Sequence, residues 1–278
     1  MIDKDKYDIT GLLYIPFSKY YNATNTFKKR LSKNEINTMI YRTFITLKNN
    51  TQSSFMEVDK DYKIVSYTSP YHLSKINSID KSTCYGRYII YIHNGYLYGH
   101  NIYTNINYEV KYADYGTKMD IRINSIMNEL VGDDTNIGGI CINGTKLILV
   151  LNSNKDIVIV SANISYKQDS IELTTIEIIK KVNKEYIKHI FNIETNIINV
   201  VFHNDYLFLL SSSTNAGNIL FIKWYKNFNC IGNTIYLTEM NIDGIPIAIS
   251  VVSNKFVLAY SDISCYVKFF ETNIENII

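Results

Sequence analysis

The sequence predicts an all-β protein built from repeated four-stranded units. One observation is a recurring pattern. It consists of an apolar run, then an Asn followed by Gly, Asp or Lys, and then a second apolar run. The Asn residues of this pattern are Asn94, Asn143, Asn204 and Asn254, at steps of 49, 61 and 50 residues. Asn-Gly and Asn-Asp tolerate the positive φ of a tight hairpin turn, so each stretch predicts strand, turn, strand. Hairpins that recur at this period are typical of a β-propeller.

The clearest unit begins near Ile137. Its second strand has apolar residues on both faces, with Leu147 and Leu149 on one and Ile148 and Val150 on the other. Such a strand is buried between neighbouring sheets. Four strands fit into this unit, which is the content of one propeller blade. We expect them at 138–142, 146–151, 157–164 and 171–179.

The same plan extends to five units along the chain, because Asn49 lies 45 residues before Asn94, a spacing similar to those between the later Asn residues. The units are expected at about 39–80, 86–131, 137–190, 197–245 and 246–278. Their innermost strands are expected at 39–47, 87–92, 138–142, 197–202 and 247–252. The fourth strand of the first unit is weakly defined and is expected within 72–76.

Closure of the ring is predicted from a mismatch between the two ends of the chain. The last unit has no obvious outer strand, whereas the N-terminal arm, residues 1–38, contains a spare apolar strand at 11–15. A terminal strand that joins the opposite end's blade removes an exposed edge. We therefore expect five blades closed by residues 11–15. The alternative is a six-bladed ring with a further blade in residues 1–38.

Three segments favour short helices between blades. Ile123, Ile126, Met127 and Leu130 have helical spacing, and Gly132 then provides a stop, which predicts a helix at 123–131. A second helix is expected within 180–190, where it explains the long 61-residue step, and a third at 26–36.

The closing unit, which reads Val-Ser-Asn-Lys-Phe-Val-Leu-Ala-Tyr-Ser-Asp at 252–262 and Tyr-Val-Lys-Phe-Phe at 266–270, resembles a WD-repeat unit of the β-propeller repeat proteins. The resemblance covers 252–262 and 266–270, and Val267-Lys268-Phe269-Phe270-Glu271 stands where that family usually ends a strand with Trp-Asp. The units at 138–164 and 198–225 match more loosely, no Gly-His pair opens each unit, and Trp224 is the only Trp. The resemblance implies a rigid disc whose faces bind other proteins, usually without catalysis.

Composition excludes several classes of function. The chain has 278 residues, 46% of them hydrophobic, and a formal net charge of +2. No basic stripe for phosphate contacts occurs, so no nucleic-acid partner is expected. The 24 Tyr, with many Asn, Ile and Lys, match codons of AT-rich genomes such as those of viruses, phages and parasites.

Targeting and metal-binding signals are also missing from the sequence. The charged N-terminus predicts no signal peptide, and no apolar run is long enough to span a bilayer, so we expect no membrane insertion and a cytoplasmic or virion location. Cys84, Cys141, Cys230 and Cys265 are far apart, which predicts free thiols in a reducing compartment rather than a disulfide framework or a zinc site. We expect no metal and no cofactor.

Catalytic signals are weak. His93 and His203 both precede the turn Asn of their units, so we expect them on one face of the disc, where they could approach each other. Five-bladed glycoside hydrolases need two carboxylates at the central channel. The expected innermost strands contain no Asp or Glu, and Asp133-Asp134 is the best remaining pair, most simply explained as a polar turn.

The Tyr residues favour an interaction surface instead. Tyr offers a large contact area at little entropic cost and is enriched at interfaces and carbohydrate sites. Among the Tyr residues crowded into the second unit, those near turns are candidate contacts: Tyr96, Tyr103 and Tyr115. With His93 and His203 they form the predicted interaction residues.

The first functional hypothesis is therefore a non-enzymatic structural or interaction propeller, such as a virion or phage-tail component, whose partners are other proteins or subunits of a larger assembly. The second is a lectin-like propeller that binds a glycan or a receptor. A glycoside hydrolase ranks third.

Overall fold

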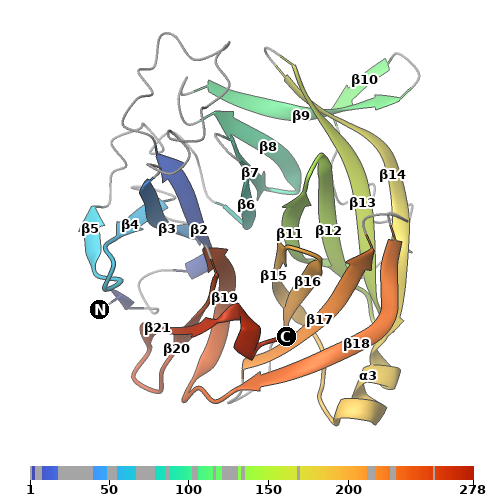
Figure 1. Cartoon of the computed structure of the whole chain (residues 1–278). Coiled ribbons are helices and arrows are strands. Elements are labelled where there is room, and N and C mark those ends of the chain that lie inside the picture. The colour runs from blue at the N-terminus through green and yellow to red at the C-terminus, as the bar shows by residue number, and fades with distance from the viewer. Residues whose placement is uncertain are drawn as a thin grey trace.

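The computed structural model describes residues 2–3, 8–17, 40–48, 55–66, 79–85, 88–101, 106–114, 117–120, 131–132, 135–167, 170–211, 217–225, 230–252 and 254–278. Figure 1 shows antiparallel sheets arranged around a common centre, with the helix α3 (Lys184–Phe191) projecting at the lower right. The architecture is all-β, as the sequence predicts.

Three units follow the predicted strand plan closely. Alternating apolar residues in neighbouring strands, closed by tight Asn-containing turns, give each an antiparallel meander. The first contains β11 (Asn136–Asn143), β12 (Lys146–Asn152), β13 (Asp156–Lys167) and β14 (Ser170–Asn183). The second contains β15 (Ile197–His203), β16 (Tyr206–Ser211), β17 (Gly217–Tyr225) and β18 (Cys230–Met240). The third contains β19 (Ile245–Val252), β20 (Lys255–Ser261) and β21 (Tyr266–Asn273).

The two N-terminal units are shifted by one strand from the prediction. One contains β2 (Asp8–Phe17), β3 (Ile40–Lys48), β4 (Phe55–Val58) and β5 (Ile64–Ser66). The other contains β6 (Lys81–Tyr85), β7 (Tyr88–His93), β8 (Tyr96–Asn101) and β9 (Ile106–Asp114), with β10 (Thr117–Asp120) added to β9. The strands expected to be innermost, 39–47 and 87–92, are the second strands β3 and β7. The innermost β6 was missed because its sequence, Lys-Ser-Thr-Cys-Tyr, lacks an apolar run.

The prediction that residues 11–15 close the ring is wrong. They belong to β2, which pairs with β3 along its length, from Asp8↔Lys48 to Phe17↔Ile40. The N-terminus does complete the last unit, but through β1 (Ile2–Asp3), which pairs antiparallel with β21 at Ile2↔Val267. The ladder with β3 satisfies the backbone groups on that side of β2 over its whole length.

The innermost strands make the fold a β-propeller. They contact one another in cyclic order, β2 beside β6, β6 beside β11, β11 beside β15, β15 beside β19, and β19 beside β2. No sheet of described strands closes on itself. A short parallel pairing of β14 with β9, around Glu172↔Lys111, joins two units into one nine-stranded sheet. The count of five blades stays a prediction, because segments such as 18–39 lie outside the described residues.

The core lies between neighbouring units. Apolar side chains from facing sheets pack there, for example Val150 of β12 with Leu209 of β16, and Phe208 with Phe256. The phenyl centroids of Phe208 and Phe256 are 5.6 Å apart. This packing between sheet faces, rather than hydrogen bonding, joins most of the units into one body.

One predicted helix lies within the described residues. α3 falls in the expected segment 180–190 but begins at Lys184, because residues up to Asn183 continue β14. Asn183 caps it by accepting a hydrogen bond from the Tyr186 backbone N–H, and Asn192 ends it in the left-handed region. The predicted helix 26–36 and almost all of 123–131 lie outside the described residues, as does 72–76. A short 3₁₀ turn, η3 (Ile274–Asn276), follows β21.

Candidate functional site: the mouth of the central channel

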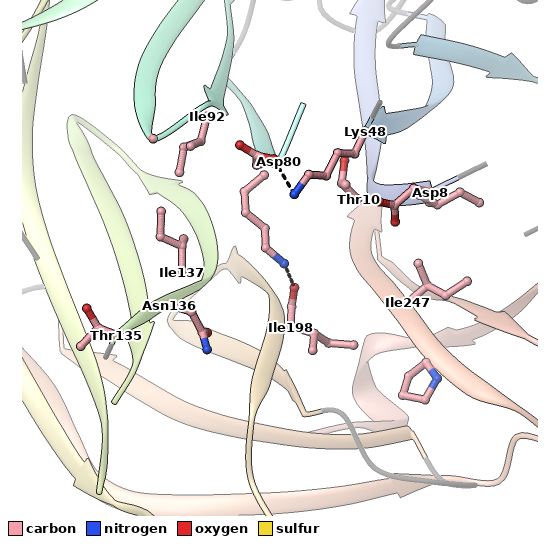
Figure 2. A pocket seen from close by; sticks show the side chains of 14 residues that line it. Asp8, Thr10, Lys48, Asp80, Ile92, Thr135, Asn136, Ile137, Ile198 and Ile247 are labelled. Atoms are coloured by element: carbon pink, nitrogen blue, oxygen red, sulfur yellow. Dashed lines mark hydrogen bonds and ion pairs between the residues drawn. The ribbon is translucent and has the colours of Figure 1, made fainter. Parts of the chain in front are cut away.

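The innermost strands all begin at one end of the central channel, and we call this end of the molecule the mouth face. A cavity of about 590 Å³ opens there and receives residues from the start of each of these strands (Figure 2). These residues are Asp8, Lys81, Asn136, Ile198 and Ile247. Deeper along the same strands the channel narrows to a second cavity of about 150 Å³, lined by residues such as Leu13, Cys84 and Phe202.

Lys81 is a partly buried charged group that lines this mouth. Its Nζ donates a hydrogen bond to the carbonyl oxygen of Ile198 in β15. Burial lowers the pKa of this ammonium to about 8, against a smaller opposing influence from Asp80. An ammonium carries three N–H donors, and the carbonyl uses one of them.

Asp80, although adjacent to Lys81 in sequence, is engaged elsewhere. Its Oδ1 forms an ion pair with Lys48 Nζ at 3.0 Å, and its Oδ2 accepts a hydrogen bond of 3.1 Å from the Asn94 backbone N–H. The carboxylate therefore anchors the β7–β8 turn to the start of β6. The Asp80 carboxylate also neutralises the charge of Lys48 in their ion pair, whereas Lys81 has no carboxylate ion-pair partner among the described residues.

Thr135 and Asn136 line the wall opposite Lys48. Thr135 Oγ1 is buried and has no hydrogen-bond partner among the described residues. Asn136 Oδ1 accepts a bond of 2.8 Å from Asn152 Nδ2, and Asn152 also bonds the backbone N–H and C=O of Ile197. These bonds fix the starts of β11 and β15 beside each other, and they leave the Asn136 side chain at the cavity wall.

The expectation that no carboxylate lies on the innermost strands is wrong, because it rested on the wrong innermost strands in two units. Asp8 begins β2, and Asp80 immediately precedes β6. Both line the mouth. A glycoside hydrolase needs a free carboxylic acid that donates a proton, whereas Asp80 is held by a lysine and a backbone N–H. The predicted pair Asp133-Asp134 lies outside the described residues.

The predicted interaction residues do not form one group. His93 and Tyr96 are cross-strand neighbours at the β7–β8 turn, and Gly95 of that turn lines the mouth. His203 ends β15, at the opposite face, where partial burial lowers its pKa. Tyr103 and Tyr115 lie outside the described residues.

The predicted approach of His93 and His203 is therefore wrong. The turn at Asn94 joins the second and third strands of its unit, whereas those at Asn143, Asn204 and Asn254 join the first and second strands. Because successive strands run in opposite directions, the two kinds of turn lie at opposite faces of the disc.

Apolar side chains are also exposed on the mouth face, outside the lining of the polar cavity. Tyr186 and Ile190 are 56% and 48% exposed on α3, which leaves the end of β14. That end of β14 pairs with the start of β13, at Asp156↔Asn183, which places α3 on the mouth face. Ile263, 85% exposed, lies in the β20–β21 turn, beside the start of β19. Sequence patterns could not find these residues, because exposure depends on which neighbours cover them.

Other site types are not seen in the part of the chain that the structure describes. No group of three or more His, Cys, Asp or Glu side chains is placed there to hold a metal ion. None of the described helices is both long and apolar enough to cross a membrane. Cys84, Cys141, Cys230 and Cys265 form no disulfide bond with one another.

No family model matches the sequence, and no curated protein matches it. Among solved structures the chain is similar to a chain of a nidogen/laminin complex, with 10% identity, 94% of this chain and 79% of that chain covered, and a TM-score of 0.45. It is also similar to the Nup133 β-propeller domain of Vanderwaltozyma polyspora, at 10% identity, with 87% and 73% covered and a TM-score of 0.37. The N-terminal domain of Nup159 has 10% identity, coverage of 82% and 72%, and a TM-score of 0.33.

Proposed function

We propose that this protein is a non-enzymatic interaction propeller whose mouth face docks a segment of another protein. The observation that carries the proposal is the layout of that face, which has both a polar cavity of about 590 Å³ and exposed apolar side chains on α3 and the last unit. Apolar contacts provide the binding energy at protein interfaces, and polar groups fix the register.

The exposed apolar residues support a protein partner more than a glycan. Tyr186 and Ile190 are four residues apart on α3 and so share one face of the helix. Only Ile187 of this helix is buried. The helix therefore attaches to the propeller through the buried Ile187 and the partly buried Phe191, and presents Tyr186 and Ile190 to solvent.

The finer prediction, that the partner is a neighbouring subunit of a virion or a phage tail, is supported by composition alone. Its Tyr-, Asn-, Ile- and Lys-rich sequence fits such a source. A protein that serves as such a subunit would bind through a face of this kind.

The proposal is tested by panning a phage-displayed library of random peptides against the immobilised protein. We expect peptides enriched on the wild type to lose at least tenfold in affinity on the double variant Tyr186→Ser, Ile263→Ser. Both side chains are exposed, so the variant should keep its melting temperature.

The matched control is Tyr225→Ser. Tyr225 is 44% exposed, but it ends β17 on the opposite face. Enrichment that depends on Tyr225 and not on the mouth-face residues would contradict the proposal, as would the absence of any enriched peptide.

A further inference from the structure

The outer strand of the last unit covers only part of its neighbour. This outer strand, β1, has two residues and pairs with Tyr266 and Val267 of β21, which is eight residues long. In the adjacent unit, by contrast, the outer strand β18 pairs with β17 from one end of the two strands to the other. No described strand lies along the outer side of β21 from Lys268 to Asn273, and we call this stretch the free edge.

The backbone of the free edge directs its hydrogen-bonding groups alternately inward and outward. At the two ends of β21 the Asp262 N–H donates to the Tyr266 carbonyl and the Ile274 N–H donates to the Asn254 carbonyl, so Tyr266 and Ile274 bond toward β20. The register between β20 and β21 is unbroken from one end to the other. Successive residues of an antiparallel strand bond in opposite directions. The outward-pointing N–H and C=O groups of the free edge therefore belong to Phe269, Glu271 and Asn273.

Each face of the free edge carries a partly exposed aromatic ring. Phe269 lies on the face toward β2–β5, where its ring stacks on Tyr62 at 3.9 Å between centroids. Phe270 lies on the other face, toward β15–β18. Side chains of an added strand would pack beside both rings, because cross-strand neighbours share a face.

The charged side chains of the free edge are already paired within the molecule. Lys268 forms an ion pair with Asp262 at 2.8 Å, and Glu271 pairs with Lys255 at 3.0 Å. Proteins commonly protect a sheet edge from strand addition with Pro or with free charges. The free edge contains no Pro, and its two charges balance each other. A segment that pairs with it therefore needs no charge of its own.

We propose that the free edge binds an extended segment of another protein, which adds to β21 as a strand beside β1. This goes beyond docking on the mouth face, because the free edge lies on the outer side of the last unit. Main-chain hydrogen bonds provide the affinity in this kind of recognition, and alternate side chains provide the specificity. The partner segment is uncharged, rich in β-branched and aromatic residues, and free of Pro, as the paired charges and the two Phe rings require.

Backbone methylation of a peptide tests strand addition directly. The probe is a phage-displayed library of eight-residue peptides in which Val, Ile, Phe or Tyr alternates with Thr or Ser, panned on the immobilised protein. The best peptide is synthesised with N-methyl groups on two alternate residues, in one form on the even and in the other on the odd positions. Only one set of N–H groups can bond β21, so we expect at least a tenfold loss of affinity in one form and little change in the other. Equal losses in both forms, or in neither, would contradict strand addition.

Asn273→Pro tests the same bonds from the side of the protein. Asn273 has a φ of −68°, which Pro adopts without strain, and its side chain makes no capping hydrogen bond to η3. The substitution removes one outward N–H and leaves the ladder with β20 intact, so we expect peptide binding to weaken about five- to tenfold. Asn273→Ala keeps the N–H and should bind like the wild type. Both variants should keep the melting temperature, and equal affinities of the two would overturn the proposal.

The same variants separate the free edge from other sites. Peptides that lose affinity on Tyr186→Ser, Ile263→Ser but not on Asn273→Pro would overturn the free edge and leave the mouth face standing. The reverse pattern would support the free edge even if no segment docked on the mouth face. Dimers of the wild type that light scattering no longer detects in Asn273→Pro would mean that β21 pairs with a second copy, which would overturn the assignment to another protein. Failure to enrich any peptide would overturn it too.

Discussion

Individual polar side chains have different roles at the two places where units meet. At the channel mouth, Lys81 donates to one carbonyl, and no second acceptor for its ammonium is seen among the described residues. At the junction of the first and last units the polar groups are fully engaged. There Tyr62 donates to Glu271 and bonds Tyr14 at 2.9 Å, and Lys255 pairs with Glu271 at 3.0 Å. The arrangement at the mouth leaves polar groups available to a ligand, whereas the arrangement at the junction stabilises the contact between the first and last units.

Lys81 should make stability depend on pH in the alkaline range. Its folded pKa of about 8 lies below the ordinary value of 10.5. Between these values the unfolded chain holds a proton that the folded chain has released, so the free energy of unfolding contributed by this residue rises with pH. We expect the stability of the wild type relative to Lys81→Met to rise from pH 8 to pH 10, measured by denaturant unfolding.

The control for this prediction is Lys60→Met, which removes an exposed lysine. Its stability relative to the wild type should stay level over the same range. Parallel pH profiles of the wild type and Lys81→Met would contradict the lowered pKa.

Tyr62→Phe should weaken the junction of the first and last units. The substitution removes the hydroxyl that bonds Glu271 and Tyr14 but keeps the ring stacked on Phe269, at 3.9 Å between centroids. We expect a loss of about 1–2 kcal/mol in the free energy of unfolding. Tyr225→Phe, at an exposed ring, should change it by less than about 0.5 kcal/mol. Equal losses in both variants would show that the hydrogen bonds at the junction are not stabilising.

At the scale of elements, the turns are the features best predicted from sequence. Asn94 and Asn204 adopt positive φ, 50° and 52°, as the pattern requires. Asn143 does not, because Gly144 takes that conformation at 60°. The turn pattern marks a hairpin correctly but does not say which two strands of a unit it joins. That ambiguity produced the shift in the second unit and the wrong pairing of His93 with His203.

The positive φ at Asn204 gives a direct test. Asn204→Val should lower stability by about 1–2 kcal/mol, since a β-branched residue is strained in the left-handed region, whereas Asn204→Gly should be nearly neutral. Asn143→Val, at a position without positive φ, should cost less than Asn204→Val. Thermal unfolding of the three variants decides this, and an equal cost at both positions would contradict the role of φ.

At the scale of the whole molecule, closure depends on a strand of two residues. Ile2 is 1% exposed and packs with Val267, Ala259 and residues of the first unit. β1 therefore binds the last unit to the first through side-chain burial more than through its short ladder.

Ile2→Ala should lower the free energy of unfolding by about 2–4 kcal/mol, the usual cost of truncating a buried aliphatic side chain. Ile278→Ala, at a side chain that is 50% exposed, should have little effect. Light scattering should give the same molar mass for Ile2→Ala as for the wild type, because β1 pairs with β21 of its own chain. A change in mass would mean that the strand joins subunits.

The sequence by itself determined the local features of this protein. Turn residues and alternating apolar runs specify hairpins over a few residues, so the strands of the last three units, the helix near 184–191 and the missing outer strand of the last unit were predictable. Tertiary structure decided the rest. Packing between units that are far apart in the chain decides which strand is innermost and which N-terminal segment closes the ring. The same packing brings Asp8, Lys81 and Thr135 to the lining of one mouth. Polar residues such as Lys81 carry no periodic signal, and their function arises only when several strands bring them together.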